Sequence, residues 1–205
     1  MKKYLPLALI MTFFTEFSMA LEAPKYTVIE TDGAFELRSY EPMIVAETLV
    51  SGDLDEASNA GFRVIAGYIF GDNKTAAGVN DKISMTVPVN MQLQSEKIDM
   101  TAPVSMQAKD GQWLIHFVMP SKYTMETLPV PDNEAVNIRQ IPARNYASIE
   151  FSGFTGPIKV AKKTEELLKW LDKKGIAPVN EPEMARYNAP WSLPFMRRNE
   201  ILVEY

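Results

Sequence analysis

Short runs of hydrophobic residues, each bounded by turn-forming residues, recur along the chain from Tyr26 onward, a pattern typical of β-strands. Fourteen prolines and ten glycines supply turns and favour a β-rich architecture over a helical bundle. Asp32-Gly33, between the first two runs, is typical of a hairpin turn. The runs predict strands over Tyr26–Glu30, Phe35–Arg38, Met43–Val50, Trp113–Met119, Val136–Ile141, Tyr146–Phe151, Met184–Tyr187 and Glu200–Tyr205.

Two further segments have hydrophobic residues at helical spacing. The first follows Asp53, which together with Glu56 three residues later has the form of a capping box, and it ends at Gly71. The second begins at Pro157, a residue suited to the first turn of a helix, and runs to about Lys174, where a glycine follows. The core-facing stripe of the first helix comprises Leu54, Ala57, Gly61, Val64, Ile65 and Tyr68.

The strands that precede the two helices are similar to each other. Val45–Gly52 comes before the first helix, and Tyr146–Gly153, about 101 residues later, comes before the second. The order of the neighbouring elements repeats as well, and no linker-like or low-complexity stretch divides the chain. These observations predict a single domain built from two βαββ-like halves.

A more specific repeat lies between the first helix and the strand at Trp113. Lys82–Gln92 and Lys97–Gln107 are identical at eight of eleven positions, and hydrophobic and polar residues alternate in each copy. The simplest arrangement is a hairpin that turns near Gln94–Glu96. The prolines of both copies lack an N–H group, so we expect them at an edge or a bulge.

The two copies carry a resemblance to a known family. Met85-Thr86-Val87-Pro88 and Met100-Thr101-Ala102-Pro103 resemble the Met-Thr-x-Pro motif of the SOUL, or haem-binding protein, family. Further resemblances lie in the hairpin of Tyr26–Tyr40, in Phe117–Tyr123, in Tyr187–Pro190 and in Arg197–Glu200. The resemblance implies an α+β fold over residues 21–205, a distorted antiparallel β-barrel from a duplicated βαββ unit with two flanking helices. It also implies a non-enzymatic protein that binds haem or a related tetrapyrrole non-covalently.

The composition is ordinary for a globular protein, with 46% hydrophobic and 23% charged residues. The absence of cysteine excludes disulfides, thiolate metal sites and cysteine nucleophiles. The single histidine excludes a multi-histidine metal site and bis-histidine haem ligation by one chain. A net charge of −5 without a basic face argues against nucleic acid as a partner. No Gly-rich phosphate loop or nucleophile elbow supports an enzyme.

Residues 1–20 have the three parts of a secretory signal peptide. Lys2 and Lys3 are basic, Leu5–Phe14 is apolar, and Ser18-Met19-Ala20 is a small-x-small cleavage site. The apolar run is shorter than the about 20 residues that a membrane-spanning helix needs. We therefore expect a periplasmic or secreted monomer without stable membrane insertion after cleavage. The alternative is an uncleaved amphipathic anchor.

The first helix has a second stripe outside its core-facing side, formed by Asn59, Phe62, Arg63, Ala66, Ile69 and Phe70. A helix that is apolar on two sides must be covered on both. One interpretation is ordinary core packing under the Met-rich hairpin or a loop. The other is the wall of a groove for a flat apolar ligand, in which Arg63 pairs with a carboxylate. The family resemblance implies a tetrapyrrole groove beside this helix and so favours Asn59, Phe62, Arg63, Ala66 and Phe70 as the site.

His116 is the candidate iron ligand, because it is the only histidine. A lone histidine on a strand is also a common hydrogen-bonded structural residue. It shares a strand face with Leu114 and Val118, and if that face is the barrel interior it lies out of reach of a macrocycle. We therefore expect haem affinity to depend more on Phe62 and Phe70 than on His116. The methionines of the repeat are soft enough for Cu(I), but they also suit adaptable core packing.

Three functions remain open from the sequence. The first is an exported, non-enzymatic binder of haem or porphyrin that carries or buffers its ligand. The second is a binding module for another flat hydrophobic molecule, as in bacterial effector-binding domains, which have a similar scaffold. The third is a small hydrolase, which would need two titratable groups that converge in a closed pocket.

Overall fold

The structure, a computed structural model, describes residues 22–74, 102–109, 111–188 and 191–205. The predicted signal peptide and the first copy of the Met-Thr repeat lie outside the described residues. The elements, in chain order, are β1 (Tyr26–Asp32), β2 (Phe35–Tyr40), β3 (Met43–Val50), α1 (Leu54–Phe70), β4 (Asn73–Lys74), β5 (Val104–Lys109), β6 (Gln112–Val118), β7 (Val130–Pro131), β8 (Asn137–Ile141), β9 (Arg144–Phe151), α2 (Pro157–Lys174), β10 (Glu183–Arg186), the 3₁₀ helix η1 (Pro194–Met196) and β11 (Asn199–Glu204).

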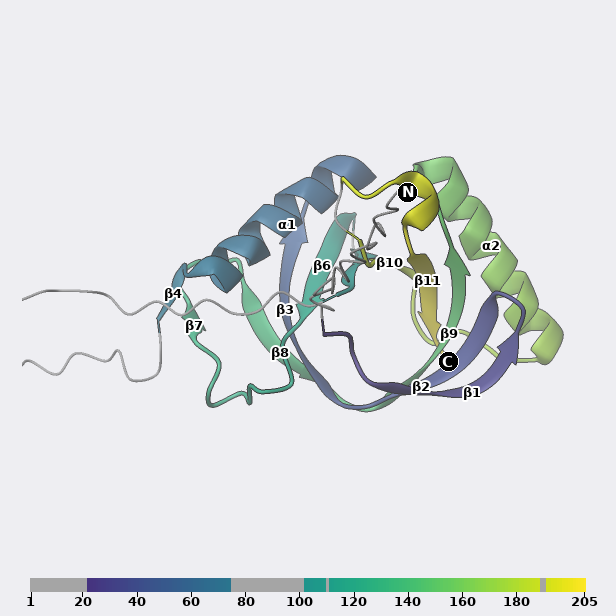
Figure 1. The fold of residues 1–205 in the computed structure, drawn as a ribbon, viewed down its shortest axis with the longest axis horizontal. Helices are drawn as coiled ribbons and strands as arrows, with labels where there is room; N and C mark the ends of the chain where they lie inside the picture. The colour runs from purple at the N-terminus through teal and green to yellow at the C-terminus, as the bar shows by residue number, and fades with distance from the viewer. Residues whose placement is uncertain (1–21, 75–101, 110, 189–190) are drawn as a thin grey trace, which may run out of the picture.

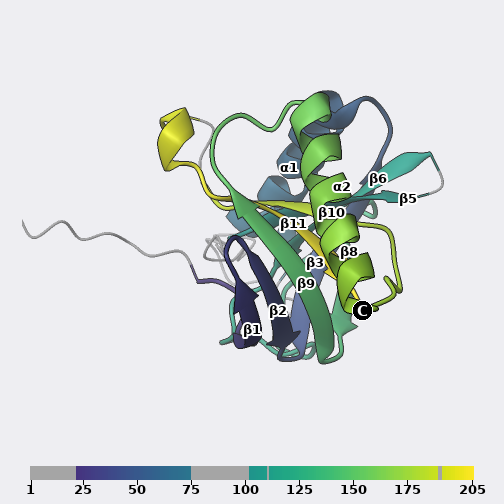
Figure 2. The same ribbon diagram turned by 90° about the vertical axis from the view of Figure 1, so that its right-hand side faces the viewer.

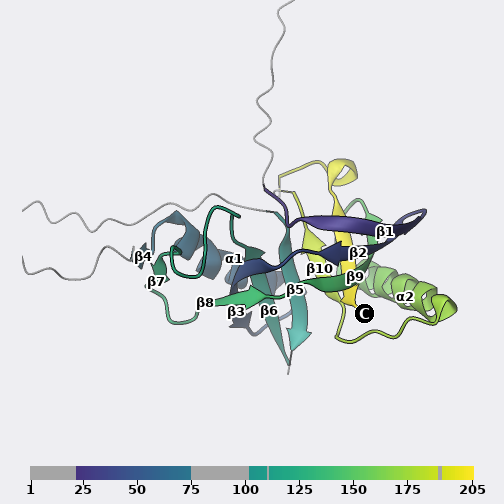
Figure 3. The ribbon, with the colours of Figure 1, turned by 90° about the horizontal axis from the view of Figure 1, so that it is seen from below.

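Nine strands form one antiparallel sheet in the order β1-β2-β9-β11-β10-β5-β6-β3-β8. The sheet curls into a half-barrel, and both helices lie on its outer side (Figure 1). α1 covers β3 and β6, whereas α2 covers β9 and β11. The two helices flank the curled sheet at its two ends when the molecule is seen from below (Figure 3). This confirms the predicted α+β class and its two flanking helices.

The predicted duplication is present in the strand order. β3, α1, β5 and β6 form one βαββ unit, and β9, α2, β10 and β11 form the other. In each unit the last strand pairs with the first, and the two units meet where β5 pairs with β10. β2 pairs with β9 and β8 pairs with β3, so the strand that precedes each unit pairs with the other unit. This exchange joins the two halves into one sheet.

Both helices begin and end where the sequence predicts. At the start of α1, Oδ1 of Asp53 accepts hydrogen bonds from the backbone N–H groups of Asp55 and Glu56, each 2.9 Å long. Gly71 ends α1 with a φ of 126°, a conformation that favours glycine. Gly175 ends α2 in the left-handed region. Figure 2 shows α2 in front of the strands that it covers.

The hydrophobic core lies between the helices and the outer side of the sheet. It takes alternate residues of each strand, because successive side chains point to opposite faces. Met106, from the second copy of the Met-Thr repeat, is buried in this core. It therefore packs as a core residue, which is one of the two roles considered for the methionines. The other large members include Ile65, Tyr68 and Ile69 from α1, Leu167 and Leu171 from α2, and Ile115, Phe117, Ile149 and Ile201 from the sheet.

Two features of the sheet differ from the predictions. The predicted hairpin between the repeat copies is wrong for residues 104–107, because β5 pairs with β6 on one side and with β10 on the other. Both edges of this strand are therefore occupied. A small sheet of β4 and β7 was not predicted, since strands of two residues show no hydrophobic pattern. No helix in the described ranges is long and apolar enough to cross a membrane.

Candidate functional site

The position of α1 is set by a close approach to β6. A Cβ atom on Gly61 would lie 2.4 Å from Cγ1 of Ile115, so no larger residue fits there without movement. With the helix this close, the ring of Phe62 lies 5.7 Å from the ring of Phe117 on β6, tilted by 52°. Phe62 therefore packs against β6, while 37% of its surface remains exposed.

The structure places the predicted stripe along the outer surface of α1, with one correction. Asn59 and Arg63 are exposed, Ala66 is half-buried, and Phe70 is 53% exposed. Ile69 was predicted to lie with them, but it is 1% exposed and belongs to the core. It lies one turn after a core-facing residue of α1, which directs it toward the sheet.

The two phenylalanines form an aromatic wall on this surface. Phe62 and Phe70 are separated by two turns, which is about 12 Å along the helix axis. The guanidinium group of Arg63 is carried by the same surface of α1. An exposed aromatic wall with a cation beside it suits a flat apolar ligand that bears a carboxylate.

Arg186 brings a second guanidinium group to α1 from β10. Its Nη1 donates a hydrogen bond of 2.9 Å to Oγ of Ser58, and its Nη2 lies 3.5 Å from Oδ1 of Asp55. Ser58 is one turn before Phe62, so Arg186 approaches the side of the helix that Phe62 occupies. Within the described chain, Nε of Arg186 is buried without a hydrogen-bond partner.

The sequence patterns do not reveal Arg186 as a site residue, because its partner Ser58 is 128 residues away in the chain. The alternating directions of the side chains along β10 do give one indication. Met184 and Arg186 point to the same face of this strand, and Met184 is a core residue. A charge on a core-facing position needs a polar partner, but the pattern does not say which one.

His116 lies on the opposite face of β6 from α1. Its neighbour Phe117 faces the helix and contacts Phe62, so His116 points into the half-barrel. Burial lowers the pKa of His116 to about 4, although the nearby Glu47 carboxylate works in the other direction. A neutral imidazole on this face cannot reach a ligand seated on α1.

Two small cavities beside His116 show how strongly the sheet curls. One cavity, of about 30 Å³, is lined from several strands, including Tyr40 of β2, Met43 of β3, Tyr146 of β9 and Glu183 of β10. The other has a volume of about 50 Å³. Strands from both ends of the sheet meet here because this face is the interior. Spaces of this size accommodate single waters and no bulky ligand.

Glu183 and His116 line both cavities. Burial of the Glu183 carboxyl group, reinforced by the Glu204 carboxylate, raises its pKa to about 7. This is the convergence of titratable groups that a hydrolase would need, but the space between them fits water rather than a substrate. In the ranges that the structure describes, no cluster of three or more acidic or histidine residues is arranged to hold a metal ion.

A buried charge network occupies another part of the interior. Arg38 on β2 and Glu200 on β11 are 2% and 0% exposed, and their side chains are joined by hydrogen bonds of 2.8 and 3.0 Å. Arg198 and the Tyr187 hydroxyl also donate to Glu200, at 2.6 and 2.7 Å. Burial works to raise the pKa of Glu200, but these donors hold it below its usual value. The network therefore ties β2 and β11 to the loop before β11.

A larger cleft, of about 410 Å³, lies at the turn between β2 and β3. Its lining includes the carboxylates of Glu22, Glu41 and Glu126 and the single cation Lys25. This excess of negative charge repels a ligand with carboxylate groups, so the α1 surface suits a tetrapyrrole better.

Comparison with known families identifies the chain. The profile of the SOUL heme-binding protein matches residues 21–204. The chain belongs to the SOUL heme-binding protein family. The match covers nearly the whole length and confirms the resemblance of the Met-Thr-x-Pro segments, the opening hairpin and the C-terminal segment. No curated protein matches the chain significantly in sequence.

Solved structures share the fold of this SOUL protein at low sequence identity. The C-terminal domain of EcmrR is 12% identical, with a TM-score of 0.54 over 87% of this chain and 96% of that domain. EcmrR in a complex with DNA gives 13% identity and a TM-score of 0.53 over 83% of this chain and 57% of the other. A hydrolase from Listeria innocua is 10% identical, with a TM-score of 0.50 over 91% and 93% of the two chains. These likenesses establish the fold alone.

Proposed function

We propose that the outer surface of α1 binds haem or a related tetrapyrrole, and that the protein carries or buffers this ligand without catalysing a reaction. The observation that carries the proposal is the exposed aromatic wall of Phe62 and Phe70 next to the guanidinium groups of Arg63 and Arg186. Membership of a haem-binding family supports the class of ligand.

Apolar burial supplies most of the binding free energy in this proposal. Full burial of one large aromatic side chain contributes about 1.5–3 kcal/mol. Phe62 and Phe70 are already partly buried, so a macrocycle that covers both gains a fraction of this for each. Arg63 adds a modest contact to a propionate, since an exposed ion pair contributes at most about 1 kcal/mol. Arg186 contributes the positive charge of its guanidinium group, which Asp55 partly offsets.

The iron plays a minor part in this mode of binding. His116, the only histidine, faces the interior of the half-barrel. When bound, haem would supply an iron that accepts axial ligands and undergoes redox chemistry, but the residues of the α1 surface would recognise the ring and its carboxylates. A metal-free porphyrin should therefore bind nearly as well as haem. The same surface would suit another flat hydrophobic anion, which is the second candidate ligand class.

Export is part of the proposal and is supported by the features of residues 1–20, a basic start, an apolar run and a small-x-small site. An exported binder of this kind would hold its ligand in the periplasm or outside the cell.

A hemin titration of the full chain tests the proposal. A saturable change in the Soret band at one site per chain is expected, with a similar affinity for protoporphyrin IX. Phe62→Ala should weaken binding at least about fivefold, because it removes half of the aromatic wall. The matched control is Phe195→Ala, which truncates an exposed phenylalanine on η1 and should leave the affinity unchanged. A linear, unsaturable response would overturn the proposal.

A further inference from the structure

A second exposed apolar surface lies at the end of the molecule where η1 is located. It consists of side chains from the β9–α2 connection, the start of α2 and the loop before β11. Trp191 and Phe195 are 86% and 74% exposed, whereas tryptophan and phenylalanine side chains are usually mostly buried. We call this surface the apolar tip and define it as Phe154, Ile158, Trp191, Leu193, Phe195 and Met196.

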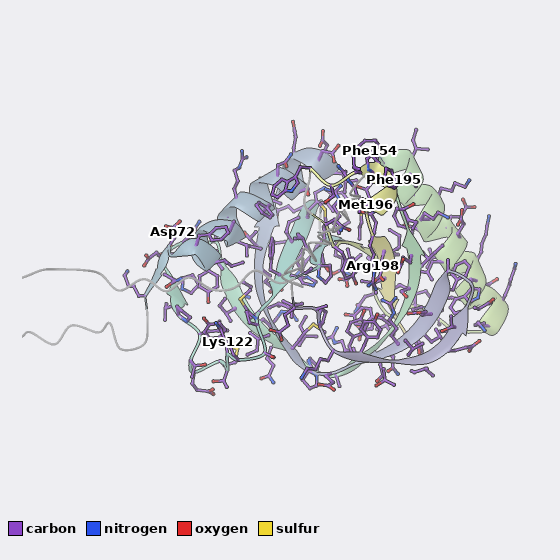
Figure 4. All side chains as sticks on the ribbon, in the orientation of Figure 1. Asp72, Lys122, Phe154, Phe195, Met196 and Arg198 are labelled. Atoms are coloured by element: carbon purple, nitrogen blue, oxygen red, sulfur yellow. The ribbon has the colours of Figure 1, made fainter. Side chains whose placement is uncertain are left out.

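The apolar tip is held by hydrogen bonds to the body of the fold. The backbone N–H of Gly153 donates to the carbonyl oxygen of Pro194 at 2.8 Å. Nδ2 of Asn199 donates to the carbonyl oxygens of Phe151 and Gly153 at 3.3 and 3.1 Å. The exposed side chains therefore project from a fixed loop. Figure 4 shows Phe154, Phe195 and Met196 together between the two helices, and η1 projects beyond the sheet in Figure 2.

The charge around the apolar tip is positive, although the whole chain has a net charge of −5. Residues 152–163 and 187–198 contain five lysines and arginines and no acidic residue. Two of the five are paired with carboxylates from outside these segments, Lys163 with Glu166 and Arg198 with Glu150 and Glu200. The guanidinium group of Arg197 lies 5.0 Å from the ring centroid of Phe154, and Lys162 lies one turn after Ile158 on α2. The acidic side chain of Asp55, at the start of α1, pairs with Arg186.

We propose that the apolar tip docks on the surface of bilayers that contain anionic phospholipids. Tryptophan and phenylalanine beside lysine and arginine are the residues that proteins place at the boundary between headgroups and acyl chains. Negative headgroups complement Lys159 and Lys162, which pair with no carboxylate of the described residues, and the guanidinium group of Arg197. A second copy of this chain would bring like charges together, so it fits the apolar tip less well. This docking is independent of ligand binding on α1.

Trp191 makes the proposal testable at the site itself. The other tryptophans, Trp113 and Trp170, are half-buried and buried, and residues 1–21 contain none, so exposed tryptophan fluorescence reports on the apolar tip. The full chain is mixed with phosphatidylglycerol–phosphatidylcholine vesicles that carry brominated acyl chains. We expect a blue shift and quenching of the fluorescence, both absent in Trp191→Phe, which should still sediment with the vesicles.

Variants of the apolar tip then distinguish lipid docking from self-association. The double variant Phe195→Ser/Met196→Ser should lower the affinity for these vesicles, measured by sedimentation, at least tenfold. Lys162→Glu should lower the same affinity at least threefold. Val179→Ser, at an exposed apolar residue away from the tip, is the control and should bind as the wild type does. The tip variants should keep hemin affinity, whereas Phe62→Ala should keep vesicle binding. Equal sedimentation of the tip variants, or an unquenched Trp191, would overturn the proposal. A dimer without vesicles that dissociates in the double variant would also overturn it and assign the tip to a second copy.

Discussion

The outer surface of α1 and the interior of the half-barrel distribute aromatic and charged side chains in opposite ways. On α1, Phe62 and Phe70 are exposed, whereas the interior buries Arg38 and Glu200. Exposed aromatic side chains gain free energy only when a partner covers them. A buried ion pair is stable only while both of its members remain. The difference fits the binding role proposed for the outer surface, while the buried network holds the curled sheet together.

Arg38→Ala should have the largest effect on stability, because it leaves the Glu200 carboxylate buried with fewer donors. Removal of one partner of a buried ion pair costs about 3–5 kcal/mol of the free energy of unfolding. Urea denaturation followed by circular dichroism measures this loss. Arg63→Ala, on the exposed surface of α1, is the matched control and should change stability by less than about 0.5 kcal/mol. Equal losses for the two arginines would contradict the contrast between the regions.

Gly61→Ala should have the next largest effect, because its Cβ atom would overlap Ile115. Overpacking of this kind costs about 1–3 kcal/mol of the free energy of unfolding. The double variant Gly61→Ala/Ile115→Ala should lose less than the sum of the two single losses, since the second change makes room for the first. Strict additivity of the losses, measured in the same urea experiment, would show that the close approach of α1 to β6 is not what places the helix.

Glu183→Gln should change how stability depends on pH. In the fold the pKa of Glu183 is about 7, above its ordinary value of 4.5. Between pH 4.5 and pH 7 the native state holds a proton that the unfolded chain releases. The stability that comes from the neutral carboxyl group is therefore present at acidic pH and is lost as the pH rises through about 7. The variant stays neutral at both pH values. We therefore expect the Tm of the variant minus the Tm of the wild type to be about 2–4 °C larger at pH 8 than at pH 5.

Differential scanning calorimetry at both pH values measures the effect of Glu183→Gln. His116 titrates in the opposite direction, because its pKa of about 4 lies below the ordinary value and stability from the neutral imidazole is lost as the pH falls. The comparison at each pH leaves His116 the same in both proteins. A Tm difference that is equal at pH 5 and pH 8 would mean that Glu183 is ionised in the fold throughout this range.

His116→Ala should have the smallest effect on ligand binding. Because the imidazole faces the interior, the hemin dissociation constant should stay within about threefold of that of the wild type. The matched comparison is Phe62→Ala, in the same Soret titration and after both variants have been checked for cooperative unfolding. Loss of a low-spin Soret band in His116→Ala, with Phe62→Ala unaffected, would move the binding site to the interior of the half-barrel.

The helices, most strands and the duplication follow from local patterns in the sequence. Asp53 and Gly71 mark the ends of α1 through interactions within a few residues, and a hydrophobic run gives a strand whatever its partner is. The aromatic residues of the α1 surface were predicted in the same way, because helical spacing assigns Phe62 and Phe70 to the side away from the core. Their role in binding a ligand stays a prediction.

Only the tertiary structure decided which distant groups meet. Arg186 reaches Ser58 across 128 residues, and Arg38 pairs with Glu200 across 162, because the strand order brings β2, β10, β11 and α1 together. The burial of Ile69 and the placement of His116 inside the half-barrel depend on how closely α1 packs and on which way the sheet curls. Hydrophobic periodicity is a local property of the chain, whereas strand order and curl arise from free energies summed over the whole sheet.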